Sequence, residues 1–284
     1  LPIPHRPRAG RELHPMVSLK RVVPIASAWS LFTVLQPAGL GQNSLSVSKP
    51  EADNSVKAEL ASFAVDKRLQ VNLFADESMG IANPVCMRWD TRGRLWVLCT
   101  WAYPQLKPGE KPNDKLLILE DTKGDGKADK ISTYADGLNM PTGFALGHGG
   151  AYIGNGRDLI HVRDATGDGK ADKSHVFVSE PHARHAPLGL AVFDNQIVLS
   201  ATPDLIVYTD VDRDARFDPK IDRRAVLLTG FQNKGHDHTL HAAVGSPSGQ
   251  WYFSFGNCGA NILTPDGRHL IAGCYYGHSE AIGK

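Results

Sequence analysis

Three acidic segments carry carboxylates at a spacing that suits a metal ion. They read DTKGDGKADK from residue 121, DATGDGKADK from residue 164 and DVDRDARFD from residue 210. Oxygen ligands at positions 1, 3, 5 and 9, with glycine at position 6, are typical of a Ca²⁺-binding loop. The sequence therefore predicts calcium ligands at Asp121, Asp125, Asp129, Asp164, Asp168, Asp172, Asp210, Asp212, Asp214 and Asp218.

An ordinary turn explains the same residues. Position 3 is Lys123 in the first segment and Thr166 in the second, and Ala215 replaces the glycine of the third. None of the segments has the bidentate glutamate at position 12. In an Asp/Gly hairpin turn, aspartate accepts backbone N–H groups and glycine adopts a positive φ. Both interpretations stay open, and a bound calcium ion would brace the fold rather than take part in chemistry.

Two other segments concentrate acid–base groups. Residues 179–187 (SEPHARHAP) contain two histidines and an arginine, and residues 231–239 (FQNKGHDHT) place Asp237 directly before His238. Histidine can act as a base near neutral pH, an adjacent carboxylate can orient it, and arginine suits an anionic ligand. We therefore predict His238 as a catalytic base with Asp237 beside it. We predict that four further residues lie near this pair and bind a cofactor: Arg157, His182, Arg184 and His185.

Two further interpretations of the histidines stay open. A histidine in a loop is commonly exposed to solvent and has no chemical role. Alternatively, His236, His238 and His241 lie within six residues of one another, and imidazole also suits a transition metal.

The spacing of the acidic segments indicates the architecture that must position these groups. They begin at residues 121, 164 and 210, so 43 and 46 residues separate them. A repeat of about 40 to 50 residues built from short strands is typical of a β-propeller blade. We expect strands a, b and c before each acidic segment and strand d after it. The expected fold is all-β, with about three full four-stranded blades and part of a fourth.

The apolar runs give the expected strands. In chain order they are 85–89, 94–100, 115–120, 131–134, 142–146, 151–154, 158–163, 174–178, 188–193, 196–201, 204–210, 225–229, 240–245 and 250–256. Residues 68–74 are expected to add a strand ahead of the first blade. Propellers typically have about 4–8 blades, so we interpret the chain as the N-terminal portion of a larger propeller. The acidic segments would then lie on one face and the histidine segments on the other, at the mouth of the channel.

Composition and charge exclude several classes of protein. Apolar residues make up 42 % of the 284 residues, with 28 glycines and 18 prolines. This mixture excludes a disordered polyelectrolyte, a coiled coil and a collagen-like rod. The net charge of +1 leaves no broad basic surface for nucleic acid. We therefore predict no nucleic-acid partner.

The N-terminal region has the features of a targeting sequence rather than of a folded domain. Residues 1–15 are basic and proline-rich, and we interpret them as upstream translation. Residues 16–41 have a short positive region, an apolar stretch and small residues near a cleavage site, which is the layout of a signal peptide. An uncleaved anchor is the alternative, although the stretch is shorter than the about 20 residues that span a bilayer. We predict export to the periplasm, cell surface or medium. A flexible linker with a helical turn is expected over 42–66, and an incomplete propeller domain over 67–284.

Four cysteines follow the signal: Cys86, Cys99, Cys258 and Cys274. An even number in an exported protein allows two disulfides. Cys86 and Cys99 lie on successive expected strands, where a cross-strand bridge and two buried thiols are both compatible with the pattern. The sequence has no CxxC or CxxCH motif, so it encodes neither a zinc knuckle nor a covalent haem site.

Two runs of sequence resemble a known domain family. They are ANPVCMRWDTRGRLWV (82–97) and DLIHVRDATGDGKADK (158–173). They resemble the N-terminal propeller of the membrane-bound dehydrogenase domain of planctomycete and verrucomicrobial proteins, and the resemblance extends from about residue 67 to the C-terminus. It implies relatives that are usually longer and often end in a haem-binding module, which would accept the electrons.

A more distant similarity bears on mechanism. Residues 237–262 (DHTLHAAVGSPSGQWYFSFGNCGANI) are similar to the segment around the catalytic histidine of soluble quinoprotein glucose and sorbosone dehydrogenases. The similarity implies that His238 takes the proton of a sugar hydroxyl while a hydride passes to pyrroloquinoline quinone (PQQ). It also implies Ca²⁺ as a cofactor.

Three hypotheses follow. The first is an exported propeller related to quinone-dependent sugar or alcohol dehydrogenases, in which Asp237 orients His238. The second is a non-catalytic propeller that binds glycan or protein at the cell surface. The third is a truncated product without stable activity.

Overall fold

The structure is a computed structural model, and it describes residues 53, 55–104, 106–180, 187–231, 239–245, 251–256 and 260–272. The chain divides into two units, 1–52 and 53–284, and the fold described below is that of the second. The predicted signal peptide lies outside the described residues. Within the described residues, no helix combines the length and the apolar character needed to cross a membrane.

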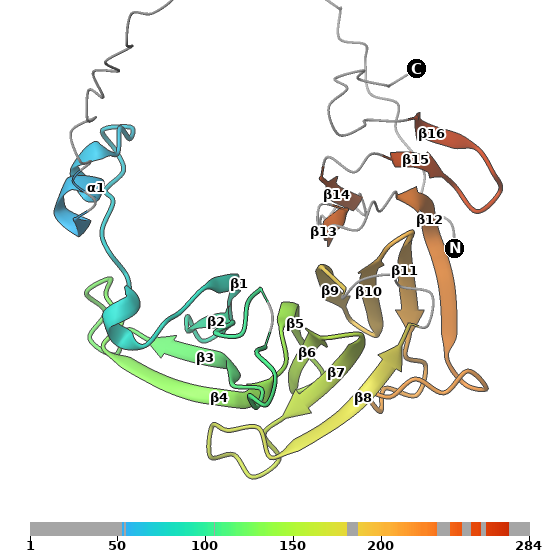
Figure 1. The fold of residues 1–284 in the computed structure, drawn as a ribbon, viewed down its shortest axis with the longest axis horizontal. Coiled ribbons are helices and arrows are strands. Elements are labelled where there is room, and N and C mark those ends of the chain that lie inside the picture. Colours follow the sequence, from blue (N-terminus) through green and yellow to red (C-terminus); the bar gives the residue numbers. More distant parts are fainter. Residues whose placement is uncertain are drawn as a thin grey trace, which may run out of the picture. The chain divides into compact units, whose positions relative to one another are not determined.

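The unit is all-β and forms a β-propeller, as the repeat predicts. Its first sheet has the strand order β1-β2-β3-β4 and its second β5-β6-β7-β8, with each neighbouring pair antiparallel (Figure 1). The bounds are β1 (Pro84–Trp89), β2 (Leu95–Cys99), β3 (Asp114–Glu120), β4 (Lys130–Leu138), β5 (Pro141–Gly147), β6 (Gly150–Asn155), β7 (Asp158–Arg163) and β8 (Lys173–Ser179).

The third blade repeats this order, and a fourth sheet follows it. The remaining strands are β9 (Gly189–Phe193), β10 (Gln196–Ala201), β11 (Asp204–Thr209), β12 (Arg223–Phe231), β13 (Leu240–Gly245), β14 (Trp251–Phe255), β15 (Ala260–Leu263) and β16 (His269–Ala272). Strands β13 and β14 pair with each other, whereas β15 pairs with the end of β12 and with β16. All fourteen runs expected within the blades are therefore strands, with bounds shifted by a few residues.

Burial follows the position of each strand in its blade. Strands b and c, such as β2 (LWVLC) and β3 (DKLLILE), are buried along most of their length. A sheet covered on both faces needs such continuous apolar runs. Strand d, such as β8 (KSHVFVS), is largely exposed, and only one of its residues, Phe177, is buried. The first strands of successive blades are neighbours: β1 contacts β5, β5 contacts β9, and β9 contacts β13.

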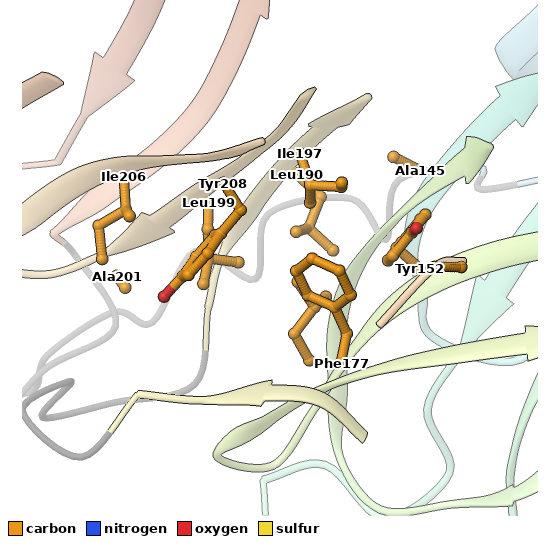
Figure 2. Packing of buried hydrophobic residues seen from close by; sticks show 11 residues of the cluster. Ala145, Tyr152, Phe177, Leu190, Ile197, Leu199, Ala201, Ile206 and Tyr208 are labelled. Carbon is orange, nitrogen blue, oxygen red and sulfur yellow. The ribbon is translucent and has the colours of Figure 1, made fainter. Parts of the chain in front are cut away.

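The core consists of layers between successive blades. The layer between the second and third blades joins Tyr152 and Phe177 to Leu190, Leu199 and Tyr208. Figure 2 shows these side chains from the two sheets meeting in one cluster. Aromatic rings meet edge-to-face there, with centroids 5.4 Å apart for Tyr152 and Phe177. This arrangement is the favoured one for aromatic pairs.

The expected strand at 68–74 is wrong, although part of this segment takes a related place. The residues form no strand, because no described strand pairs with them. The helix α1 (Val56–Ser62) and the 3₁₀ turn η1 (Glu77–Met79) flank the segment. Ala128 N–H donates to the Phe74 carbonyl (2.8 Å), just as Ala171 N–H donates to the Tyr134 carbonyl of β4 (2.7 Å). Phe74 thus holds the position that strand d of a preceding blade would take.

The two described cysteines, Cys86 and Cys99, are free thiols. Cys86 pairs with Leu98 in the β1–β2 ladder, whereas Cys99 pairs with Pro84. Cys86 packs with Leu98 against the second blade, and Cys99 belongs to the cluster on the opposite face of the sheet. A cross-strand bridge is therefore not formed, because the two side chains point to opposite faces. Cys258 and Cys274 lie outside the described residues.

Candidate metal site and channel

The three acidic segments form the loops between strands c and d, as expected. They connect β3 to β4, β7 to β8, and β11 to β12. In each loop the first aspartate follows strand c, and an aspartate just before strand d ends the loop. These two aspartates hold the backbone of the loop in place, so their hydrogen bonds decide whether a carboxylate oxygen is left for a metal ion.

In the first two loops the leading aspartate is occupied by backbone donors. Asp121 accepts from the N–H groups of Gly124 (2.7 Å) and Gly126 (2.8 Å), one on each oxygen. Asp164 accepts in the same way from Gly167 and Gly169. The N–H bond from Gly126 is the main cause that lowers the pKa of Asp121, and Gly169 has the same effect on Asp164. This is the geometry of the turn interpretation.

The third loop differs at its leading aspartate. Asp210 is completely buried, and its Oδ2 atom accepts from Ala215 N–H at 2.9 Å. Its Oδ1 atom is buried without a hydrogen-bond partner. Asp210, Asp212 and Asp222 each offer an oxygen, and these oxygens lie within 4.8 Å of one another. Three carboxylates around one point are a typical ligand set for a hard divalent cation.

Charges around this triad leave it strongly negative. Partial desolvation and the neighbouring carboxylates of Asp214 and Asp222 raise the pKa of Asp212. The loop's own Arg213 turns to Asp194, with both N–O distances at 2.6 Å. A cation would relieve the repulsion among the carboxylates.

Asp222 is the ligand that counting positions from the start of the loop missed. It lies twelve residues after Asp210, whereas Asp129 and Asp172 lie eight residues after the aspartates that open their loops. Its Oδ1 accepts from Val211 N–H at 2.8 Å, which matches the bonds from Thr122 to Asp129 and from Ala165 to Asp172. Its Oδ2 accepts from Asp218 N–H at 2.7 Å, so a cation would share these oxygens with backbone donors. Alignment from the loop's end finds it, because all three loops end in Lys-x-Asp followed by Lys or Arg.

The other predicted ligands serve as local turn caps. Asp214 accepts from Arg216 N–H (2.7 Å) and Asp218 from Lys220 N–H (2.9 Å). In the first two loops, Asp125 and Asp168 make the same bond to the residue two positions later. The described triad therefore includes neither Asp214 nor Asp218.

A side chain of the second blade approaches the triad. His148, in the turn between β5 and β6, has its Nδ1 atom 3.8 Å from Asp210 Oδ2 and 2.6 Å from the Tyr152 hydroxyl. Burial raises the pKa of Tyr152, which keeps its hydroxyl protonated as the donor to Nδ1. His148 Nε2 donates to the Asp194 carbonyl at 2.8 Å. The second and third blades therefore meet at the acidic loop.

A separate cavity lies along the first strands of the blades. Its volume is about 550 Å³, and β1, β5, β9 and β13 contribute its lining. The lining side chains that carry sulfur, oxygen or nitrogen are Cys86, Met87, Arg88, Thr142 and His241. The cavity lies along the first strands of successive blades, where a propeller has its channel.

The predicted catalytic and mouth residues are mostly outside the described part of the chain. Those outside it are His182, Arg184, His185, Asp237 and His238. Arg157 is described: it is exposed in the turn between β6 and β7 and is not among the residues that line the cavity. Leu188 and His241 do line it; Leu188 follows the first histidine segment directly, and His241 lies two residues after the second.

Comparison with family models gives a match over most of the chain. The model described as "Domain of unknown function (DUF7133)" matches residues 55–184 and again residues 164–275. The chain belongs to this family. The DUF7133 description names no activity, so the dehydrogenase resemblance stays a prediction. No curated protein matches the chain.

Solved structures similar to this DUF7133 chain share little sequence with it. A protein described as a "putative gluconolactonase" is 17 % identical with a TM-score of 0.40. The match covers 60 % of this chain and 54 % of that protein. PorZ, a surface component of the type-IX secretion system of Porphyromonas gingivalis, is 9 % identical with a TM-score of 0.42, covering 66 % of this chain and 26 % of its own. A protein from Lactobacillus plantarum is 13 % identical with a TM-score of 0.42, covering 72 % of this chain and 73 % of its own. The chain thus spans about half of the first structure and a quarter of the second.

Proposed function

We propose that this protein is a calcium-binding β-propeller, in which one ion bound by Asp210, Asp212 and Asp222 braces the third blade. The observation that carries the proposal is the buried, unpartnered Oδ1 atom of Asp210. An unpaired buried carboxylate oxygen is costly, and a cation removes that cost. The all-oxygen ligand set favours Ca²⁺ over softer metals that prefer nitrogen or sulfur.

Titration calorimetry with Ca²⁺ after treatment with a chelator tests this function. We expect one binding site and a higher Tm in calcium than in chelator. An ion present at 100 times its Kd adds about 2.7 kcal/mol to the free energy of unfolding. Equal Tm values, together with no heat of binding, would contradict the proposal.

A second candidate function rests on the channel. We propose that the cavity of about 550 Å³ along β1, β5, β9 and β13 takes a carbohydrate or small alcohol. Its support is the position of Leu188 and His241, which line the cavity within two residues of the ends of the two histidine segments. His238 would then take the proton of the substrate hydroxyl, with Asp237 orienting the imidazole. A bound quinone such as PQQ would supply the hydride acceptor.

Dye reduction in the presence of Ca²⁺, PQQ and a panel of sugars tests the second function. We expect reduction by the protein and its loss in His238→Ala, with an unchanged melting curve. Retained turnover in this variant would remove His238 from the base role. Binding of a sugar without any dye reduction would favour the non-catalytic glycan-binding alternative.

A further inference from the structure

Ala215 occupies a backbone position that the other loops give to glycine. It is the fifth residue after the leading aspartate, as are Gly126 and Gly169. Its φ is +61°, and the two glycines have φ values of +84° and +87°. A residue with a side chain pays roughly 1–2 kcal/mol for the left-handed conformation, whereas glycine does not. Some contact must therefore hold Ala215 in this conformation.

The second blade supplies that contact. The Nε2 atom of His175, on β8, lies 2.6 Å from the Ala215 carbonyl oxygen. A carbonyl only accepts, so Nε2 carries the hydrogen and donates it. The methyl group of Ala215 is buried in the same layer as Phe177 and Tyr208. Both ends of the alanine are thus fixed by groups that lie outside its own loop.

The held conformation acts directly on the candidate metal ligand. With Ala215 left-handed, its N–H donates to Asp210 Oδ2 at 2.9 Å. This bond fixes the rotation of the carboxylate about Oδ2, while the other oxygen, Oδ1, has no partner. The chain of contacts runs from His175 through the Ala215 peptide to Asp210.

We infer that His175 is a positioning residue for the cation site, so that the affinity of the third loop for calcium depends on a side chain of the second blade. This inference rests on the calcium function proposed above. The first loop has a related contact, since Asn72 Nδ2 donates to the Gly126 carbonyl. There the captured residue is glycine, which adopts the conformation unaided, so the loop needs no such support.

The experiment measures the Kd for Ca²⁺ in full-length variants by calorimetry. His175→Leu keeps most of the side-chain volume and removes the donor, while His175→Gln keeps an amide donor near the Nε2 position. We expect the Leu variant to bind calcium about 3- to 10-fold more weakly, the range for one neutral hydrogen bond, and the Gln variant to recover most of the loss. Melting in chelator reports general damage separately.

The Ala215→Gly variant distinguishes positioning of the metal site by His175 from a general structural role of His175. Glycine adopts the left-handed conformation without help. We therefore expect His175→Leu to weaken calcium binding much less in the Ala215→Gly background than in the wild type. If His175→Leu alone fails to fold, His175→Gln is compared with the wild type, and His175→Leu in the Ala215→Gly background is compared with Ala215→Gly alone.

The outcomes separate the inference from the function on which it rests. If the wild-type protein binds no calcium, both the proposed function and the inference about His175 are wrong. If the wild type binds but His175→Leu has the same Kd, the function stands and the inference is overturned. A loss that neither Gln at position 175 nor Gly at position 215 restores also overturns it, because that pattern indicates general damage.

Discussion

In all three acidic loops the leading aspartate accepts from the N–H group five residues later, which belongs to Gly126, Gly169 or Ala215. In the first two loops the second carboxylate oxygen accepts from the residue three positions later. In the third loop it has no partner. The leading carboxylate is therefore fully hydrogen-bonded within the turn in the first two loops. In the third loop, one of its oxygens is buried without a partner.

This difference shows how a repeated turn can become a metal site. The third loop has Asp212 where the others have Lys123 and Thr166. It is also four residues longer before its closing aspartate, Asp222, which nevertheless keeps its bond to the backbone after strand c. Asp212 and the insertion ahead of Asp222 thus bring three carboxylates together within the same order of strands.

The largest expected effect comes from Asp210→Asn, which keeps the shape but removes the charge of the ligand. We expect calcium binding to weaken by at least about 100-fold, equivalent to about 2.7 kcal/mol, because the affinity of such sites depends on the number of charged ligands. In chelator the variant should be at least as stable as the wild type, since the unpaired buried charge is gone. Calorimetry and melting curves measure both.

Asp164→Asn is the matched control at the equivalent position of the second loop. Its carboxylate serves the N–H groups of Gly167 and Gly169, so calcium binding should not change. If both variants lost calcium affinity equally, the contrast between the loops would be wrong.

The layers beneath the loops differ in their response to pH. His161 is completely buried beside Tyr152 in the layer under the third loop, and burial lowers its pKa to about 4. The unfolded chain takes up this proton near pH 6.5 and the folded chain only near pH 4, so stability falls as the pH drops through that window. Between pH 6.5 and 5 the loss is about 2 kcal/mol.

Denaturant titrations across this range measure the pH effect. His161→Gln does not titrate and should flatten the dependence, whereas the wild type should lose stability steadily. A flat profile for the wild type would mean that His161 is protonated without cost in the folded state.

Asp164→Ala measures how much the hydrogen bonds of the second loop contribute to the free energy of unfolding. Without its carboxylate, the N–H groups of Gly167 and Gly169 must turn to water. We expect a Tm lower by about 2–4 °C, the shift for one net hydrogen-bond contribution in a domain of this size, with or without calcium. A loss of stability that appeared only in the presence of calcium would instead assign this loop to metal binding.

The strands could be predicted from the sequence, whereas part of the metal site could not. Apolar runs bounded by glycine and aspartate located the strands of three blades, because b and c strands must be apolar on both faces. The segment at 68–74 misled, since Phe74 packs against the first sheet without joining it, whereas Leu69 and Val71 are exposed. Asp210 and Asp212 were found from ligand spacing, whereas Asp222 was hidden by the four-residue insertion.

Two features of the site are apparent only in the structure. Asp210 Oδ1 has no partner, although the first two loops supply an N–H group to the equivalent oxygen from the residue three positions later, and composition does not encode this difference. His148 and His175 approach the loop from the second blade, 62 and 40 residues away from Asp210 and Ala215 in the chain. Such partners become visible only when the blades are packed together.

The smallest expected effect compares the left-handed residues themselves. Gly169 has a φ of +87° and open space where a Cβ would lie, so Gly169→Ala tests backbone strain alone and should cost about 1 kcal/mol. Ala215→Gly relieves the same strain but loses a buried methyl worth about 0.8 kcal/mol and gains freedom in the unfolded chain. We therefore expect a change near zero in denaturant titrations carried out in chelator. A cost above about 1 kcal/mol for Ala215→Gly would show that packing against the second blade, rather than the turn, sets the conformation of the third loop.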